Sequence, residues 1–433
     1  MATLGILINH YDARNDIRDL VVELARSHKV VLLGPQGSVH PKHLHSGIEF
    51  RPCRRVGRFR SWVIAQLYRH FGFIPKSKDN FFINELFKIE PLTGFRRLKA
   101  KLTLFIRMHA PFRIMPETFL NALKDCDTTP VDDIDGFLLI TEFSDNALTA
   151  RIVSSGKPNC AYVYSWDHPC KHTVMTRGVK RYAVWNSNLT EDMVELQSID
   201  RGSCQVVGAT QLAPITTYLS SAPSPSQGTL EGRPYFYFGC GVGPLALAKE
   251  EMEVARRLAQ VLRSRAPGHL LLVRPYPMSH GVDLRPMLQN LENVRWDDDF
   301  RSNQVGRSLG SANISQRLAL QRGCTAFFHI GTTMGFEGAF LDIPCVLLRP
   351  PRKCELDADK FQKLVEFSDQ YHLQKHLAFA GNTVGLGSDL DRLVKELLSG
   401  DQTVKSTNKL VRADTPILPM RELADKLAEL SLG

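Results

Sequence analysis

The first 40 residues alternate apolar runs with an amphipathic stretch. Residues 4–9, LGILIN, form a run of β-strand length. Between residues 17 and 28 the apolar positions 17, 20, 21, 24 and 25 recur at helical spacing. KVVLLG follows at residues 29–34 and ends at a Gly-Pro pair. A strand, a helix and a second strand in this order predict a parallel sheet that is covered by helices.

The same alternation continues through the first half of the chain. Strands are predicted at residues 134–140 (IDGFLLI), 159–164 (NCAYVY), 180–185 (KRYAVW) and 205–207 (QVV). Each of these apolar runs breaks into polar residues at its carboxyl end. Ligands bind at this edge of open α/β sheets, so the polar residues there are the first candidates for function.

The second half repeats this pattern after a break. Residues 216–234 are rich in Pro and Ser and lack periodicity, which predicts a linker. Strands follow at YFYFG, HLLLV, TAFFHIG and IPCVLL, with a helix at residues 249–265. The last residues, 416–433, form an amphipathic helix that is expected to pack back on the N-terminal domain. We therefore predict one Rossmann-like domain at residues 1–215 and another at 235–415, facing each other across a cleft.

Composition supports a two-domain protein without a membrane span. A chain of 433 residues is too long for one ordinary core. No apolar stretch reaches the about 20 residues that cross a bilayer, and the N-terminus lacks the basic segment of a signal peptide. The nine cysteines form no Cys-x-x-Cys pair and fit no common zinc pattern. These features predict a cytoplasmic protein with reduced thiols and no metal site.

The net charge of +9 is unevenly distributed. Residues 51–113 hold fifteen Lys and Arg against Asp79, Glu85 and Glu90, with aromatic residues interleaved. We predict that residues 50–115 form a basic helical insertion in the N-terminal domain. Such a segment suits an anionic membrane surface or an acceptor with phosphate or carboxylate groups. A solvated helix with a packed apolar side stays open, and no nucleic-acid module is present.

The segment from His329 to Leu348 carries the strongest signal for a ligand site. A buried strand leads into Gly331, Thr332 and Thr333 open a helix, and Glu337 follows one turn later. Free amides and the positive dipole end at a helix N-terminus suit a phosphate, and the carboxylate of Glu337 can reach a ribose beyond it. The alternative is a threonine N-cap and a solvated surface carboxylate.

Two further segments are candidates for the same donor site. The loop after YFYF contains Gly239, Gly241 and Gly243, where backbone amides can approach a phosphate closely. Arg274 and Tyr276 lie at the end of the strand HLLLV; the first suits a phosphate and the second can stack on a base or sugar. Tight structural turns explain both segments equally well.

Candidates for acid–base chemistry and acceptor binding lie in the first half of the chain. They follow strand ends, so all are expected at one edge of the N-terminal sheet. The candidate general bases are His10, Asp12, Glu142 and Asp167. His168 and Asn186 are expected to line the acceptor side of the cleft. Helix capping or another structural hydrogen bond stays open for each of them, Asp12 included.

The motifs in this order resemble GT-B-fold glycosyltransferases of bacterial surface-carbohydrate assembly. The resemblance rests on SWDHP, AVWN, VVGATQ, VRPYP and GTTMGFEGAFLDIPCVLL between residues 160 and 350. It extends to enzymes of capsule, lipopolysaccharide and teichoic-acid synthesis, including the CDP-glycerol glycerophosphotransferase-like group. VRPYP is similar to their Arg/Lys-x-His-Pro turn, with Tyr276 at the position of the histidine. Residues 40–130 carry no such resemblance.

The resemblance implies transfer of a sugar from a nucleotide-activated donor to a hydroxyl of a glycan or lipid-linked acceptor. It implies no metal and no cofactor, a donor site in the C-terminal domain and a base in the N-terminal domain. The basic insertion would then lie on the inner face of the cytoplasmic membrane. A sugar-nucleotide epimerase or polyol-phosphate transferase on the same fold, and a non-catalytic nucleotide-sugar-binding scaffold, remain as alternatives.

Overall fold

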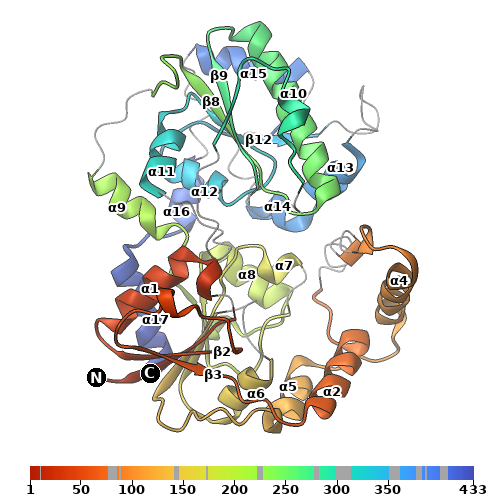
Figure 1. The fold of residues 1–433 in the computed structure, drawn as a ribbon, viewed down its shortest axis with the longest axis vertical. Helices are drawn as coiled ribbons and strands as arrows, with labels where there is room; N and C mark the ends of the chain where they lie inside the picture. The colour runs from red at the N-terminus through yellow and green to blue at the C-terminus, as the bar shows by residue number, and fades with distance from the viewer. Residues whose placement is uncertain are drawn as a thin grey trace. The chain divides into compact units, whose positions relative to one another are not determined.

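The computed structural model divides into two compact units, each built around a parallel sheet (Figure 1). Of the described residues, the N-terminal unit comprises those within Met1–Ala213 and Pro416–Gly433, and the C-terminal unit comprises those between these two ranges. The structure describes residues 1–9, 11–76, 85–86, 89–140, 146–171, 174–221, 228–276, 282–297, 314–350, 361–376, 383–385, 388–399 and 408–433.

The described strands of the N-terminal unit form a seven-stranded sheet in the order β3-β2-β1-β4-β5-β6-β7, and every pairing is parallel. The strands are β1 Thr3–Leu7, β2 Lys29–Gly34, β3 Ile48–Pro52, β4 Gly136–Ile140, β5 Asn159–Tyr162, β6 Arg181–Val184 and β7 Cys204–Val206. Its helices include α1 Asn15–Ala25, α2 Arg58–Phe71, α4 Gly94–His109, α5 Pro116–Leu123, α6 Asn146–Ser154, α7 His168–Lys171 and α8 Ser187–Glu195. Nearly all residues of β1, β2 and β4 are buried, as the continuous apolar runs predict for a sheet covered on both faces.

The described strands of the C-terminal unit form a six-stranded parallel sheet in the order β10-β9-β8-β11-β12-β13. They are β8 Tyr235–Gly239, β9 Leu270–Arg274, β10 Val294–Trp296, β11 Phe327–His329, β12 Cys345–Arg349 and β13 Thr383–Gly385. The helices are α9 Ala213–Ser221, α10 Leu245–Arg265, α11 Ile314–Gly323, α12 Met334–Phe340, α13 Gln362–Ser368, α14 Tyr371–His376, α15 Ser388–Leu398 and α16 Asn408–Asp414. Two parallel-strand sheets with flanking helices are the architecture that the hydrophobic pattern predicted.

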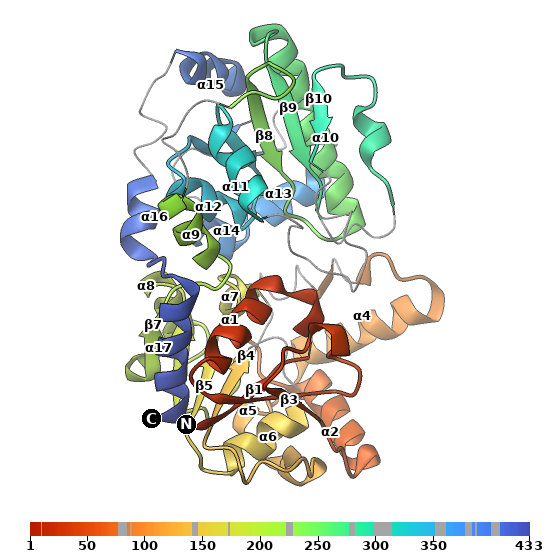
Figure 2. The same ribbon diagram turned by 60° about the vertical axis from the view of Figure 1, so that its left-hand side comes forward.

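The C-terminal helix α17, Met420–Leu432, belongs to the N-terminal unit. It lies beside α1 in Figures 1 and 2, with Leu423 and Leu427 on its buried face. The helix also passes close over β4, because a Cβ atom on Gly136 would lie 2.1 Å from the carbonyl oxygen of Ser431. The segment Pro416–Gly433, which contains α17, therefore belongs to the N-terminal unit although it follows the C-terminal unit in sequence.

Some elements carry no clear pattern in the sequence. Strand β3 lies at the start of the predicted basic insertion, and β10 and β13 are only three residues long. Residues 216–234, predicted as an irregular linker, begin inside helix α9. With three residues each, β10 and β13 carry too little sequence for a period-2 pattern, and β3 overlaps the stretch that was predicted as helical. Among the described residues, no helix combines the length and the apolar character that a membrane crossing needs.

Candidate functional site

The carboxyl edge of the C-terminal sheet brings the predicted donor segments together. Strands β8 and β11 pair directly, so the loop after β8 and the segment after β11 lie side by side. A Cβ atom on Gly241 would lie 2.1 Å from the carbonyl oxygen of Gly331 and 2.9 Å from Cβ of Thr332. Two segments 90 residues apart in the sequence therefore meet, and glycine at position 241 is what permits the contact.

Gly331 has a second reason to be glycine. Its φ angle of +149° lies in a region that residues with a side chain rarely adopt, and a Cβ atom would approach Leu373 to 2.7 Å. His329, the last residue of β11, lies two positions before Gly331. Its side chain is buried, with 1% of the residue exposed, and burial lowers its pKa to about 3. His329 is thus neutral and supplies no positive charge for a phosphate.

Thr332 and Thr333 are half-buried at the start of α12. The Thr332 hydroxyl accepts a 3.4 Å hydrogen bond from the amide of Met334, and its carbonyl accepts a 3.0 Å bond from Gly335. Thr333 is the N-cap of the helix, and its carbonyl accepts from Phe336 at 3.0 Å. The helix start that the sequence indicates is present, and a donor contact by either threonine stays a prediction.

Glu337 lies inside the protein and pairs with Arg317 of α11. Both carboxylate oxygens accept from the guanidinium, one of them at 2.9 Å from Nη2, and both side chains are 7% exposed. The sequence suggested that Glu337 either binds a ribose or is a solvated surface carboxylate. In the structure it is instead buried and ion-paired with Arg317. Contact with a ribose would require Glu337 to leave a buried, bidentate ion pair.

The glycine loop, residues 239–243, already binds a carboxyl group from its own chain. The amide of Gly241 donates to Oε1 of Glu251 at 2.8 Å, and the amide of Val242 approaches Oε2 at 3.4 Å. Glu251 lies on α10 and is 1% exposed; burial raises the pKa of its carboxyl to about 8, against the opposing effect of the two amides. These amides are the groups that the sequence assigned to a phosphate, and here they fix the loop instead.

Arg274 is also engaged within the fold. Its Nη1 donates to Oδ2 of Asp297 at 2.7 Å, and Asp297 also accepts from the hydroxyl of Tyr237. The side chains of Arg274 and Asp297 are 9% and 3% exposed. Tyr276 lies next to the glycine loop, with its ring 3.4 Å from a Cβ built on Gly243. The ion pair with Asp297 therefore fixes Arg274 at the end of β9. Of these two predicted donor residues, Tyr276 lines the pocket described next and Arg274 does not.

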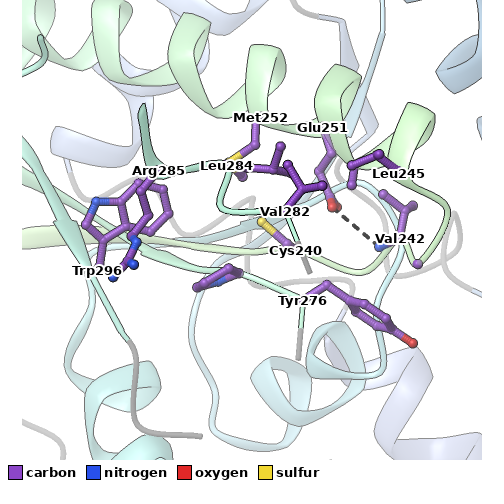
Figure 3. A pocket seen from close by; sticks show the side chains of 13 residues that line it. Cys240, Val242, Leu245, Glu251, Met252, Tyr276, Val282, Leu284, Arg285 and Trp296 are labelled. Carbon is purple, nitrogen blue, oxygen red and sulfur yellow. Dashed lines mark hydrogen bonds between the residues drawn. The ribbon is translucent and has the colours of Figure 1, made fainter. Parts of the chain in front are cut away.

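A pocket opens beside these segments, entirely within the C-terminal unit (Figure 3). Its walls are mostly apolar and come from the glycine loop, the start of α10, the end of β9 and β10. They include Cys240, Val242, Leu245, Met252, Tyr276, Leu284, Arg285 and Trp296. Figure 3 shows the Trp296 ring and Arg285 at one end and Glu251 bound to the loop at the other. The lining is thus mostly apolar, with an indole and a guanidinium at one end.

In the N-terminal unit, Asp12 pairs with a histidine that sequence reasoning missed. Its Oδ1 lies 2.8 Å from Nδ1 of His43, and its Oδ2 accepts from the amide of His40 at 2.8 Å. Asp12 lies in a 3-10 turn after β1 (Tyr11–Ala13) and His43 in another after β2 (Pro41–His43), so neighbouring strands position the pair. The side chains are 20% and 22% exposed, which leaves the pair accessible to a ligand.

The other candidates of this unit lie at the ends of β5 and β6. Asp167 accepts a 2.5 Å hydrogen bond from the Ser165 hydroxyl, and His168 is 3% exposed at the start of α7. Asn186 is fully buried, and its side chain caps α8 by accepting from Leu189 at 2.9 Å. Capping accounts for Asn186. The roles of Asp167 and His168 stay predictions, while His10 and Glu142 lie outside the described residues.

A polar network joins the strand ends of the same unit. The carboxylate of Asp16 accepts from Thr210 at 2.6 Å and from the Tyr164 hydroxyl at 3.1 Å. Burial raises the pKa of Asp16 above its ordinary value. Thr210 belongs to the VVGATQ segment that was predicted at this edge of the sheet. The network thus anchors that segment to α1 and keeps the edge in place.

This chain resembles known proteins in three-dimensional structure and not in sequence. No family model and no curated protein matches the sequence. A putative UDP-N-acetylglucosamine 2-epimerase from Listeria monocytogenes superposes with a TM-score of 0.50 at 11% identity, over 99% of this chain and 95% of that one. MurG of Acinetobacter baumannii gives 0.48 at 10% identity, over 99% and 100%. The wall teichoic acid polymerase TagF gives 0.48 at 9%, over 99% and 88%. The chain has the two-domain α/β architecture of GT-B proteins.

Proposed function

We propose that this protein is a cytoplasmic, metal-independent glycosyltransferase that uses a nucleotide-activated sugar. The observation that carries the proposal is the meeting of Gly241 with Gly331 and Thr332 at one sheet edge, beside an apolar pocket. Two loops and a helix start converge at the carboxyl ends of parallel strands, where α/β proteins bind nucleotides. Among the solved structures with a similar fold are a MurG, a TagF and epimerases that act on UDP-N-acetylglucosamine.

The residues of the C-terminal unit suggest how the donor binds. The pocket lined by Trp296 and Tyr276 takes the nucleobase, and the half-buried start of α12, with Thr332 and Thr333, faces the diphosphate. Hydroxyls and helix amides there stabilise the charge that develops on the leaving group. Glu251 keeps the glycine loop closed against the neighbouring segment, so it shapes the site without touching the donor.

The pair of Asp12 and His43 suggests the base. A carboxylate accepts hydrogen bonds, so the proposal places the donating proton on Nδ1 of His43 and uses the lone pair of Nε2. In the proposed reaction, Nε2 takes the proton of an acceptor hydroxyl while that oxygen bonds to the anomeric carbon. The bond between this carbon and the diphosphate oxygen breaks, and the nucleoside diphosphate leaves. The acceptor is a hydroxyl of a surface glycan or a lipid-linked sugar.

Thermal-shift screening tests the donor site. UDP-, GDP-, ADP-, dTDP-, CDP- and CMP-linked donors are added to the purified protein, and one nucleotide class is expected to raise the Tm. A ligand at a hundred times its Kd stabilises a fold by about 2.7 kcal/mol, which gives a clear shift. The response should vanish in Tyr276→Ala and persist in Tyr218→Ala, which replaces a tyrosine of α9 that does not line the pocket. A flat response to every donor would reject the proposal.

An epimerase on the same fold is the second candidate, since the Listeria structure bears that name. An epimerase converts its donor without any acceptor and releases no sugar to another molecule. Incubation of the responding donor alone, followed by chromatography of the sugar nucleotide, separates the two. An epimeric product in the absence of acceptor would favour the epimerase. A polyol-phosphate transferase would respond to CDP-glycerol, and a scaffold would bind donor without any turnover.

A further inference from the structure

Helix α4 exposes an apolar stripe along its length. Phe95, Leu98, Leu102 and Phe105 follow one another at steps of three, four and three residues, so they share one face of the helix. These residues are 78%, 64%, 56% and 58% exposed. Soluble proteins rarely present such a contiguous row of large apolar side chains to water. The stripe therefore needs a partner.

The core does not account for the stripe, because α4 packs through its other side. Leu104 is 8% exposed and clusters with Ile89, and Ile74 and Ala100 pack against them. The guanidinium of Arg107 donates to the carbonyl of Phe73, and burial lowers its pKa. Figures 1 and 2 show α4 standing apart from the strands of its own unit. One face of the helix holds it in the fold and the opposite face remains outside.

Positive charge borders the stripe on both flanks. Helical spacing puts Lys99 beside one edge of the stripe and Lys101 beside the other, with Arg96 and Arg97 farther round the helix, and all four residues are exposed. Residues 94–109 contain no Asp or Glu. The charge on this surface is thus of one sign, and the long Lys and Arg stems can lie along apolar material while their heads stay in water.

We propose that the α4 stripe inserts into the surface of an anionic lipid bilayer. A bilayer offers what this face requires: acyl chains for the four apolar side chains and negative headgroups for the four cations. A second copy of the chain would bring the same row of positive charges against itself, which is repulsive. The inference does not depend on the proposed transferase activity, since binding to lipid is measured without donor or acceptor.

The neighbouring helix α2 extends the exposed surface. Phe59 and Trp62 stack with their ring centroids 6.1 Å apart and are 78% and 58% exposed. Helices α2 and α4 pack on each other, so both belong to one structural element. Tryptophan is favoured at membrane–water interfaces because one part of its ring is apolar and its N–H remains wet. The insertion thus exposes a second pair of apolar rings, on α2.

Vesicle co-sedimentation of the full-length protein tests this inference. Vesicles of phosphatidylcholine alone are compared with an equimolar mixture of phosphatidylcholine and phosphatidylglycerol, at low and at raised salt. The first variant, Leu98→Gln/Leu102→Gln/Phe105→Gln, replaces three of the four stripe residues and keeps the charge. The second, Arg96→Gln/Arg97→Gln/Lys99→Gln/Lys101→Gln, removes the charge and keeps the stripe. The matched control, Leu219→Gln/Ile314→Gln/Leu398→Gln, replaces three residues of other helices that are 36%, 37% and 39% exposed.

The parent and the control should bind the anionic vesicles, and binding should weaken as salt rises. Each α4 variant should lower the partition coefficient by about tenfold or more while keeping the parent's circular dichroism and Tm. Equal binding to both kinds of vesicle, or parent-like binding by the stripe variant, would overturn the inference. So would self-association without lipid that the stripe variant abolishes, because the stripe would then bind a second copy.

Discussion

The carboxylate of Asp12 lies 2.8 Å from Nδ1 of His43, and the two residues belong to turns that follow adjacent strands of one parallel sheet. The same carboxylate accepts from the amide of His40, which holds the second turn against the first. A histidine oriented in this way by a carboxylate is a well-placed proton acceptor. The sequence offered Asp12 as one of four candidate bases; we propose His43 as the base and Asp12 as the group that positions it.

Replacement of His43 by Gln should lower kcat by roughly a hundredfold to ten-thousandfold, the usual contribution of a general base. Donor affinity should stay unchanged, because donor binding is assigned to the other unit. Asp12→Asn should lower kcat less, since the imidazole remains. His45→Gln is the control, because His45 is an exposed histidine beyond the turn that carries His43. Steady-state kinetics measures kcat, and calorimetry measures donor affinity. Full turnover by His43→Gln would show that His43 is not the base.

Gly241→Ala should damage the donor site through packing alone. The added methyl group would lie 2.1 Å from the carbonyl oxygen of Gly331, so the two segments must separate. We expect a loss of about 1 to 3 kcal/mol in unfolding free energy and weaker donor binding. Gly268→Ala is the matched control, because nothing lies within 4 Å of its added Cβ. Urea unfolding of both variants checks this, and equal stabilities would mean that the loops do not touch.

Stability should fall as pH rises, owing to Glu251. Burial raises its pKa in the folded protein to about 8, whereas the unfolded chain has the ordinary value of 4.5. Between these values the folded state holds a proton that the unfolded state has lost. The contribution of Glu251 is therefore greatest below pH 4.5 and declines toward pH 8. Glu251→Gln keeps an oxygen for the Gly241 amide and cannot ionise.

The plot of Tm against pH should accordingly be flatter for Glu251→Gln than for the parent between pH 4.5 and 8. Glu253→Gln serves as control on the same helix, since Glu253 is an ion-paired, less buried carboxylate. An unchanged slope in Glu251→Gln would show that Glu251 is ionised in the folded state.

Variants of the ion pair between Arg317 and Glu337 test whether Glu337 stabilises the fold or binds the donor. Glu337→Gln leaves a buried guanidinium without its full counter-charge and should cost about 3 to 5 kcal/mol of unfolding free energy. The double variant Arg317→Met/Glu337→Leu removes both charges and should recover much of that loss. Urea unfolding and calorimetric donor titration on both variants give the answer. Recovered stability with lost donor affinity would make Glu337 a donor ligand, whereas recovery of both would make the pair structural.

Features that depend on a local sequence pattern could be predicted from the sequence, whereas side-chain contacts between distant parts of the chain could not. Buried parallel strands such as β1 and β8 are continuous apolar runs, so their positions along the chain and the fold class could be derived from the sequence. The side-chain partners of Glu337, Arg274 and Glu251 lie 20, 23 and 9 or 10 residues away, on other elements. No local pattern distinguishes a carboxylate that meets a ligand from one that meets a buried arginine. His43 was missed for the same reason, because only the sheet brings its turn to Asp12.

Transfer of labelled sugar is the most direct measure of the central claim. The donor that stabilises the protein is supplied with its sugar labelled, together with a glycan- and lipid-containing membrane fraction. The account predicts that label moves from the nucleotide into the acceptor fraction with the parent protein, and that His43→Gln transfers far less while binding the donor as well. Label that remains on the nucleotide, or that is recovered as an epimeric sugar nucleotide without any acceptor, would contradict the assignment as a glycosyltransferase.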